Sequence, residues 1–321
     1  MAGETSVMAG LAPHRPCWQQ GVAMHLVVAG LGYAGTEVAR RALAAGMTVT
    51  GTRREPEGGE AADSASSGGP AVLRFAEAGP ALRHATHLLV TAAPGEAGDP
   101  VLQAHGAAIA AAERLRWVGY MSTTAVYGDL GGGWAEEATP PAPRQDRAHR
   151  RLAAERAWAT ALVGRGAALD LFRTAGIYGP GRSALDDLRA GRARRVDRPG
   201  HVFSRIHRDD IAAAILAGIA RPPAPGQARV LNLADDEPAA GADVVAEAAR
   251  LLGLEPPPLV SFAEAWEAMS PMGRSFWSES RRVRSAATKA ALGIEWRYPS
   301  YREGLRGILA AEAGQGGAQT G

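Results

Sequence analysis

The sequence predicts an α/β fold in which a doubly wound parallel sheet is joined to a smaller C-terminal lobe. Two observations support this prediction. Strand-like apolar runs alternate with Ala-rich amphipathic helices from Met24 onward, which is the pattern of a parallel sheet covered on both faces. After Ile177 the rhythm breaks into short pieces punctuated by proline and glycine, so we expect a smaller, irregular lobe over the carboxyl ends of the strands.

The elements are placed in order along the chain. Strands are predicted at residues 26–29, 47–51, 72–75, 87–92, 117–122 and 168–173, and the helices between them include residues 35–45, 100–115 and 147–162. We expect a first domain over residues 24–176, to which residues 204–235 return, and a lobe formed mostly by residues 177–313. Residues 1–23, 55–70 and 314–321 are predicted to be a disordered extension, a flexible loop and a flexible tail.

Composition excludes several classes of protein. The 321 residues are 46% hydrophobic and 21% charged, as in a globular protein of about two domains. Because the 35 basic and 33 acidic residues are spread along the chain, there is no one-faced basic stripe for a nucleic acid. Cys17 is the single cysteine, so an intrachain disulfide and a thiolate metal site are ruled out, which fits a reducing cytoplasm. No apolar run is long enough to span a membrane, and the first 23 residues lack the apolar core of a signal peptide.

A glycine-rich turn follows the first strand. HLVVAG leads directly into LGYAG, which spaces three glycines as in a dinucleotide-binding turn. The first glycine allows a tight turn, the second lets the backbone approach a pyrophosphate, and the third lets the helix pack on the strand. The first domain is therefore predicted to be a Rossmann-type NAD(P)-binding domain, with a merely tight structural turn as the alternative. The expected cofactor contacts in this turn are Gly30, Leu31, Gly32, Tyr33, Ala34 and Gly35.

Two arginines stand where the cofactor is selected. Arg53 and Arg54 follow the second strand, and no acidic residue precedes Glu55. A carboxylate there would bind the ribose 2′-OH of NAD, whereas guanidinium groups suit a 2′-phosphate. NADP is therefore favoured over NAD; the alternative is that both arginines are solvated loop charges. Ala92, Ala93 and Ser122, at the ends of two other strands, are further expected cofactor contacts.

Several motifs, in this order and spacing, resemble the extended short-chain dehydrogenase/reductase family, which includes NAD-dependent epimerases and dehydratases of nucleotide sugars. They are GLGYAG at 30–35, MSTTAVYGD at 121–129, RTAGIYGPGR at 173–182, SRIHRDDIAAA at 204–214, LNLADDEP at 231–238 and YPSYREGL at 298–305. The resemblance covers most of the chain. It implies an NAD(P)-dependent oxidoreductase or epimerase/dehydratase that acts on a carbonyl, hydroxyl or nucleotide-sugar-like substrate, with a homodimer as the default assembly.

The resemblance also shows a departure at the catalytic residues. Thr123 matches the serine or threonine that, in the family, hydrogen-bonds the reacting oxygen, but the family's Tyr-x-x-x-Lys is missing. Taking LAAE at 152–155 as the anchor, the lysine position falls on Arg151 and the tyrosine position on Arg147. Arg151 can still hold the cofactor ribose, but an arginine cannot cycle as acid and base because it does not deprotonate in proteins.

Another group must then carry the proton. Tyr127, in the same loop as Thr123, is the first choice, and the alternative is that it packs under the loop. The remaining candidates are Tyr178, His149 and His207. His149 should point to a different helix face from Arg147, and the acids Asp209 and Asp210 after His207 are explained by capping of a helix.

Two groups of residues in the lobe concern the substrate. Arginine forks match phosphate geometry, so a phosphate-bearing substrate would suit the cluster Arg182, Arg189, Arg192, Arg194, Arg195 and Arg198; the alternative is a solvated helix and turn. RSFWSESRR at 274–282 combines aromatic rings with guanidinium groups, which could stack on a base or simply pack the lobe.

Three functions remain open on the sequence. The first is an NADP-dependent enzyme with a displaced proton carrier, and the second is a catalytically silent NADP-binding sensor or regulatory protein. The third is a different chemistry on the same fold, with Thr123 and the cofactor only positioning a substrate. The fold does not choose between them, because function belongs to the site.

Overall fold

The structure is a computed structural model that describes residues 23–55 and 68–317. Almost all of the predicted N-terminal extension (residues 1–22), most of the predicted flexible loop (residues 56–67) and the last four residues of the predicted tail (318–321) lie outside the described residues. The other residues of that tail, 314–317, are the last turn of the C-terminal helix.

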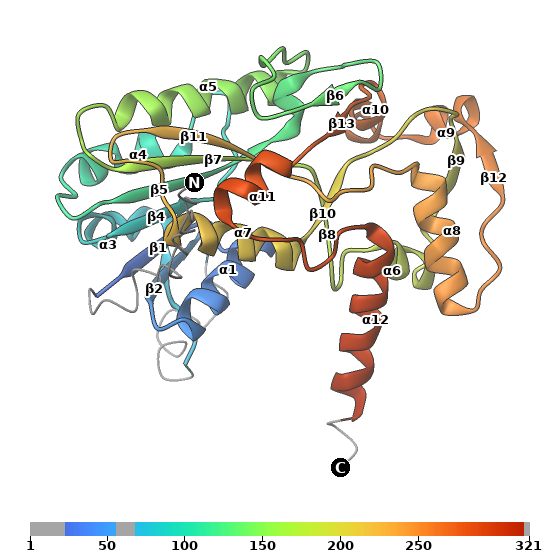
Figure 1. Ribbon diagram of the computed structural model, residues 1–321, viewed down its shortest axis with the longest axis horizontal. Coiled ribbons are helices and arrows are strands. Elements are labelled where there is room, and N and C mark those ends of the chain that lie inside the picture. The colour runs from blue at the N-terminus through green and yellow to red at the C-terminus, as the bar shows by residue number, and fades with distance from the viewer. Residues whose placement is uncertain (1–22, 56–67, 318–321) are drawn as a thin grey trace, which may run out of the picture.

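A seven-stranded parallel sheet forms the centre of the molecule (Figure 1). Its spatial order is β11-β7-β5-β4-β1-β2-β3, and every neighbouring pair is parallel. All six predicted strands are confirmed within two residues at either end, and β11 comes from the segment expected to return to the first domain. The bounds are β1 His25–Ala29, β2 Thr48–Arg53, β3 Ala71–Arg74, β4 His87–Val90, β5 Trp117–Thr123, β7 Ala168–Thr174 and β11 Ala228–Leu233.

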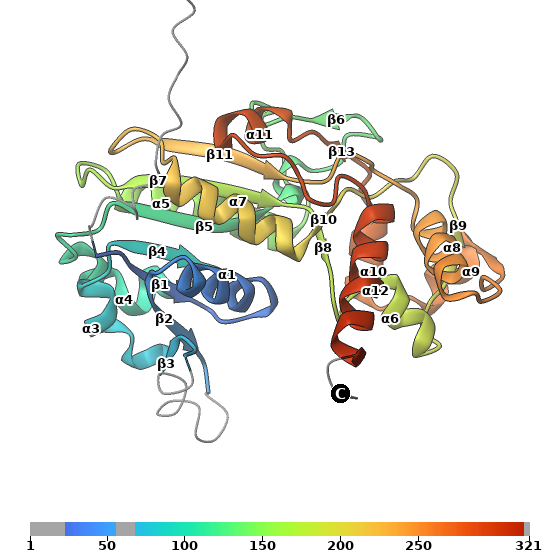
Figure 2. The same cartoon turned by 60° about the horizontal axis from the view of Figure 1, so that its bottom comes forward.

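Helices cover both faces of the sheet because its strands are apolar on both sides. One layer contains α1 (Tyr33–Ala44) and α7 (Arg208–Ala220), which lie side by side in Figure 2, together with α11 (Ala286–Leu292). The other layer contains α3 (Gly79–Arg83), α4 (Pro100–Ala110) and α5 (Asp146–Ala161). Along β1, Val28 packs with the first layer and Val27 with the second, and both are fully buried. Helix α4 ends five residues before its predicted end, and Leu115 is buried ahead of β5 instead.

Most of the remaining described residues build the smaller lobe (Figure 1). Its own apolar core includes Leu185, Ala248, Tyr301 and Leu305. Its helices are α6 (Ala184–Arg189), α8 (Gly241–Leu252), α9 (Phe262–Ala268), α10 (Pro271–Trp277) and α12 (Tyr301–Gly317). Short parallel strand pairs accompany them: β8 (Gly176–Tyr178) with β10 (Arg205–His207), β9 (Arg195–Asp197) with β12 (Leu259–Ser261), and β6 (Trp134–Ala135) with β13 (Arg282–Val283).

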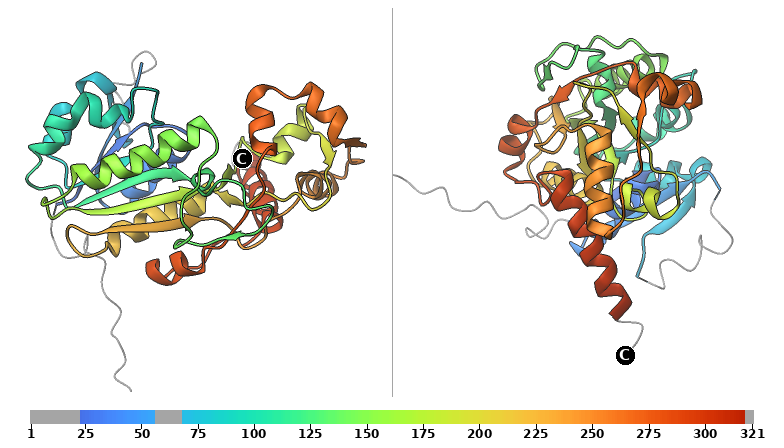
Figure 3. Two further views of the ribbon diagram at one scale, coloured as in Figure 1. Left: turned by 90° about the horizontal axis from the view of Figure 1, so that it is seen from above. Right: turned by 90° about the vertical axis from the view of Figure 1, so that its right-hand side faces the viewer.

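The strand order reverses between β1 and β4, because the chain continues from β1 to β2 on one side and returns to β4 on the other. In doubly wound sheets ligands bind beyond the carboxyl ends of the strands at this switch point. The lobe lies on that side of the sheet, as the left view of Figure 3 shows. Among the described helices, none is long and apolar enough to cross a membrane.

Candidate functional site

A cavity of about 740 Å³ lies between the carboxyl ends of the strands and the lobe. Its walls come from the glycine turn, the ends of β5 and β7, helix α5, strands β8 and β10, and residues 275–283. The two parts of the fold therefore meet at one chamber. Of the predicted cofactor contacts in the turn and at the ends of the strands, Gly32, Tyr33, Ala34, Gly35, Ala93 and Ser122 line it; Gly30, Leu31 and Ala92 do not.

The three glycines of the turn differ in local geometry, and the geometry at each is compatible with the role expected from its spacing. Gly30 has a φ of +114°, and a Cβ there would lie 2.5 Å from Thr91 Oγ1, so only glycine fits. A Cβ on Gly35 would collide with the carbonyl oxygen of Gly30, which is where α1 packs closely on the strand. Gly32, by contrast, has nothing within 4 Å of its Cβ position and lines the cavity. A bare backbone at the start of α1 thus faces open space, as a pyrophosphate site requires.

A second cavity, of about 470 Å³, continues from the turn to the end of β2. Three guanidinium groups line it, from Arg40, Arg53 and Arg208. Arg53 was predicted to lie here, whereas Arg54 is exposed and does not line the cavity. Arg40 and Arg208 were not predicted, because Arg40 lies about two turns into α1 and Arg208 lies 155 positions after Arg53 in the chain.

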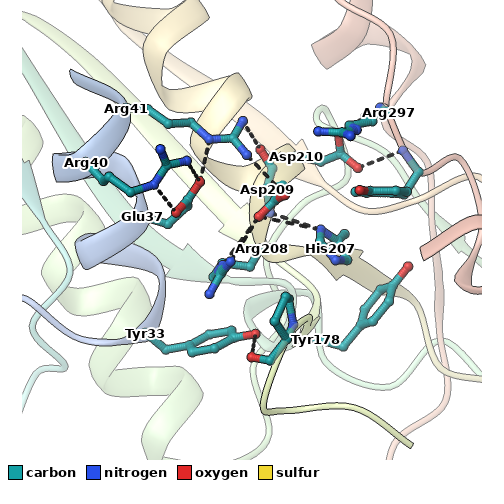
Figure 4. A network of polar contacts seen from close by, with 12 residues as sticks. Tyr33, Glu37, Arg40, Arg41, Tyr178, His207, Arg208, Asp209, Asp210 and Arg297 are labelled. Carbon is teal, nitrogen blue, oxygen red and sulfur yellow. Dashed lines mark hydrogen bonds and ion pairs between the residues drawn. The ribbon is translucent and has the colours of Figure 1, made fainter. Parts of the chain in front are cut away.

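Glu37 is the acidic residue of this second cavity, but its carboxylate is fully engaged (Figure 4). Arg40 donates to it at 2.7 and 2.9 Å, and Arg41 donates to it at 2.6 Å. Burial alone would raise the pKa of Glu37, yet the hydrogen bonds from the two arginines outweigh it and lower the pKa to about 2. The carboxylate is therefore neutralised by its own helix.

Figure 4 also places His207 and the acids that follow it. We expected the acids to cap α7, but His207 itself is the cap: its Nδ1 accepts from the backbone N–H of Asp209 at 3.1 Å. Asp209 pairs with Arg41 at 3.2 Å, and Asp210 accepts from two backbone N–H groups further along the chain. Burial lowers the pKa of His207 to about 4, and the ring does not line the large cavity. His149 is exposed on α5, so neither histidine reaches the chamber.

Thr123 ends β5 at the wall of the large cavity. Its side chain lines the cavity, and its Oγ1 accepts from the backbone N–H of Ala125 at 3.2 Å, a bond that leaves the hydroxyl proton free for another acceptor. The neighbouring Ser122 also lines the cavity and donates to Glu155 at 2.5 Å. The buried carboxylate of Glu155 thus holds Ser122 and, with it, the end of β5.

Tyr127, the first choice for the proton carrier, does not line the cavity. Its side chain is fully buried, its hydroxyl donates to Asn232 Oδ1 at 2.7 Å, and Arg173 stands over its ring at 4.9 Å. Burial raises the pKa of Tyr127. The structure corrects that assignment in favour of the alternative, a tyrosine that packs under the loop.

Arg151 and Arg147 both line the cavity from α5. Arg151 donates to the carbonyl oxygen of Met121 at 2.5 Å, so the cation at the family's lysine position lies beside the end of β5. Arg147, at the tyrosine position, has its guanidinium carbon 4.2 Å from the centre of the Phe276 ring. It cannot act as acid and base, because an arginine does not deprotonate at neutral pH. Tyr178 lines the cavity, but its hydroxyl donates to the Ser300 carbonyl at 3.3 Å.

Only one of the six lobe arginines singled out for a phosphate, Arg182, lines the cavity. Arg189 and Arg192 pair with Glu312 and Asp187 on the surface. Arg195 and Arg198 donate to backbone carbonyls, and Arg194 is exposed. Arg205, Glu279 and Arg281 also line the cavity. Glu279 and Arg281 belong to the segment 274–282 that was expected to concern the substrate, but none of the three was singled out individually as a cavity residue.

Comparisons place this arrangement among known proteins. No family model matches the chain. Protein YeeZ of Escherichia coli K12 is 28% identical over 287 residues, which cover 85% of this chain and 96% of that protein. A conserved protein of unknown function from Silicibacter pomeroyi is 43% identical with a TM-score of 0.80, and the match covers 90% of this chain and 99% of the other. A Methylobacillus flagellatus protein provisionally assigned as an NAD-dependent epimerase/dehydratase is 25% identical with a TM-score of 0.64, over 91% and 99% of the two chains.

More distant structures share the fold and were determined with nucleotides. MoeE5 in complex with UDP-glucose and NAD is 20% identical with a TM-score of 0.71, over 91% and 99% of the two chains. A human epimerase family protein with NADPH is 17% identical with a TM-score of 0.68, over 89% and 99%. By its parallel sheet, its glycine turn and the match to the Methylobacillus protein along most of its length, the chain has the fold of NAD-dependent epimerase/dehydratase proteins and is similar to members of that family.

Proposed function

We propose that the protein is an NADP-dependent oxidoreductase of the epimerase/dehydratase type that acts on a carbonyl or hydroxyl carbon of a phosphate-bearing substrate. One observation carries the proposal: the open backbone at Gly32 joins a large chamber that contains Thr123 to a second cavity that contains three arginines. A dinucleotide has three matching parts: a reactive ring for the large chamber, a pyrophosphate for the backbone at Gly32 and an adenosine for the second cavity.

The residues present fit a nicotinamide dinucleotide. The first N–H groups of α1 have no partner within the helix and suit the pyrophosphate, and the bare Gly32 lets that group come close. Arg151 would bind the nicotinamide ribose as the family's lysine does. When bound, the nicotinamide supplies the acceptor or donor of a hydride. Relatives that hold NAD or NADPH share the fold and support this reading.

The preference for NADP rests on the second cavity. Arg53, with Arg40 and Arg208, surrounds the space beside the end of β2, and guanidinium groups bind phosphate through charge-assisted hydrogen bonds. The acid that could instead favour NAD, Glu37, is held by Arg40 and Arg41. The balance of charge favours a 2′-phosphate over a 2′-hydroxyl.

The substrate class follows from the large chamber. Arg182, Arg205 and Arg281 line it beside the two arginines of α5, and a cavity with this excess of positive charge favours an anion. A phosphate or diphosphate is the anion whose geometry arginine forks match best. Thr123 would then bind the reacting oxygen of the substrate at the end of β5.

Calorimetry with NADP⁺ and NAD⁺, followed by assay of NADPH absorbance with nucleotide sugars and carbonyl compounds, tests the proposal. We expect both nucleotides to bind, NADP⁺ more tightly, and at least one phosphate-bearing compound to change the absorbance. Binding without any turnover across the panel would favour a silent NADP-binding protein, and tighter binding of NAD⁺ would overturn the cofactor preference.

A further inference from the structure

The large chamber contains only one carboxylate. Five arginines line it, and Glu279, between α10 and β13, is the single acidic residue among its described lining residues, which include no histidine, lysine or cysteine. Hydride transfer at an alcohol or carbonyl needs a side chain that accepts and returns a proton. Within this wall, that leaves Glu279 and two tyrosines.

Both tyrosines already use their hydroxyl proton. Tyr33 donates to the carbonyl oxygen of Pro180 at 2.9 Å, and Tyr178 donates to that of Ser300 at 3.3 Å. Burial raises the pKa of each tyrosine, so neither forms the phenolate that would accept a proton near neutral pH. Neither Tyr33 nor Tyr178 therefore replaces the acid/base tyrosine of the family.

Glu279 differs from the tyrosines, because one of its two carboxylate oxygens accepts no hydrogen bond from the described residues. The residue is only 7% exposed; its Oε2 accepts from Arg281 Nη1 at 2.7 Å, whereas its buried Oε1 has no hydrogen-bond partner within the described part of the chain. A buried carboxylate oxygen left without a donor is costly, so a fold that keeps one has a use for it.

The surroundings of Glu279 place its carboxylate near the reaction centre. The same Nη1 of Arg281 donates to the carbonyl oxygen of Gly128 at 2.8 Å, which ties the Glu279–Arg281 pair to the loop that begins at Thr123. On the other side, the negative charge of Glu279 acts on Arg147, the residue at the family's tyrosine position. Glu279 therefore lines the same cavity as Thr123 and Arg147 and is linked to the Thr123 loop through Arg281.

We propose that Glu279 is the proton acceptor and donor of the reaction, in place of the absent tyrosine. This inference rests on the proposed function. In the oxidation direction, the proton of the substrate O–H bond would pass to the Glu279 carboxylate as that bond breaks. The electron pair of the C–H bond would leave as hydride, which the nicotinamide accepts when bound, and a C=O bond would form. In reduction, Glu279 returns the proton to the oxygen. The positive charges of Arg147 and Arg281, which line the same cavity, would stabilise the developing alkoxide.

The test compares Glu279→Gln with wild type and with a matched control, Glu136→Gln. Glu136 is also held by an arginine, at 3.1 Å from Arg284, but it is exposed and lies outside the cavity. UDP-glucose with NADP⁺ and 9,10-phenanthrenequinone with NADPH serve as probes, and NADP⁺ binding and the melting temperature of each unliganded protein are measured in parallel.

We expect kcat/KM of Glu279→Gln to fall at least about 100-fold on a probe that wild type turns over, while NADP⁺ affinity stays within about twofold, because the residue contacts the substrate and not the cofactor. The rate of oxidation by wild type should fall as the pH is lowered. Any residual activity of Glu279→Gln should not show this fall. The melting temperature should fall by no more than a few degrees, because the amide oxygen of glutamine can still accept from Arg281 although the ion pair is lost. Glu279→Asp should recover part of the activity, and Glu136→Gln should behave as wild type.

Other outcomes separate the two claims. Turnover by Glu279→Gln within about threefold of wild type would overturn the role of Glu279 and leave the oxidoreductase standing. A variant that melts several degrees lower and loses NADP⁺ binding would show a structural residue and overturn the role as well. If wild type binds NADP⁺ but turns over neither probe nor any compound of the wider panel, the proposed oxidoreductase function is wrong, and so is the proposed role of Glu279.

Discussion

The carboxylate of Glu155 holds the guanidinium of Arg173 through two hydrogen bonds, of 3.1 and 2.8 Å, and both side chains are almost fully buried between α5 and β7. The same carboxylate accepts from Ser122 at the cavity wall, and Arg173 stands over the ring of Tyr127. The carboxyl ends of β5 and β7 are thereby tied to the helix that carries Arg147 and Arg151. The pair positions the site without touching its cavity.

Breaking this pair should destabilise the fold strongly. Glu155→Ala leaves Arg173 as an uncompensated buried charge, so we expect the free energy of unfolding to drop by about 3–5 kcal/mol, measured by urea denaturation. The matched control is Glu312→Ala, which breaks the surface pair with Arg189 and should cost at most about 1 kcal/mol. Equal losses in the two variants would contradict the account.

Arg208 and Arg53 should set the preference for NADP. Removing one charge-assisted contact costs about 1.5–3 kcal/mol, so each change to alanine should weaken NADP⁺ binding at least about tenfold and leave NAD⁺ binding unchanged in calorimetry. Arg54→Ala is the control, because its side chain is exposed outside the second cavity. If only Arg54→Ala weakened NADP⁺ binding, the 2′-phosphate would instead be bound by the loop that follows β2.

Tyr127→Phe should affect stability and not chemistry. The change leaves the buried Oδ1 of Asn232 without its donor, which costs about 1–3 kcal/mol. Turnover should stay within about threefold of wild type, because the hydroxyl lies outside the cavity. Thr123→Ala provides the contrast: we expect it to lose activity, while the lost bond from the Ala125 N–H lowers stability by only about 1 kcal/mol.

Acid should weaken the fold through His207. Burial lowers the pKa of His207 from its ordinary value of 6.5 to about 4, so between these two values the unfolded chain binds a proton that the folded chain does not. The contribution to stability is complete above pH 6.5 and is lost as the pH falls toward 4. Urea denaturation of His207→Asn, which keeps a helix cap but does not titrate, should show a shallower loss between pH 6.5 and 4.5 than wild type. His149→Asn, on the surface, is the control, and identical pH profiles of wild type and His207→Asn would refute this assignment.

The parts of the fold that follow from local pattern could be predicted from the sequence. The strands and the glycine turn depend on apolar runs and on residues that are neighbours in the chain, so Gly30 and Gly35 occupy the positions that their spacing indicates. The chamber depends on contacts across long separations, and these have no local signal. Glu279 comes to the Thr123 loop through a bond from Arg281 to Gly128, 153 positions apart, and Tyr127 turns inward because Asn232, 105 positions later, accepts its hydroxyl.

The most direct test of the cofactor site is calorimetric titration with NADP⁺ of Gly32→Leu against wild type. Gly32 has a φ of −88° that any residue can adopt, and its Cβ position is empty to 4 Å, so the variant should fold. Gly106→Leu, on α4 and equally free of neighbours within 4 Å, is the matched control. The account predicts that wild type and Gly106→Leu bind NADP⁺ and that a folded Gly32→Leu binds it at least about 30-fold more weakly. Unchanged binding by Gly32→Leu, or no heat from wild type with either nucleotide, would contradict it.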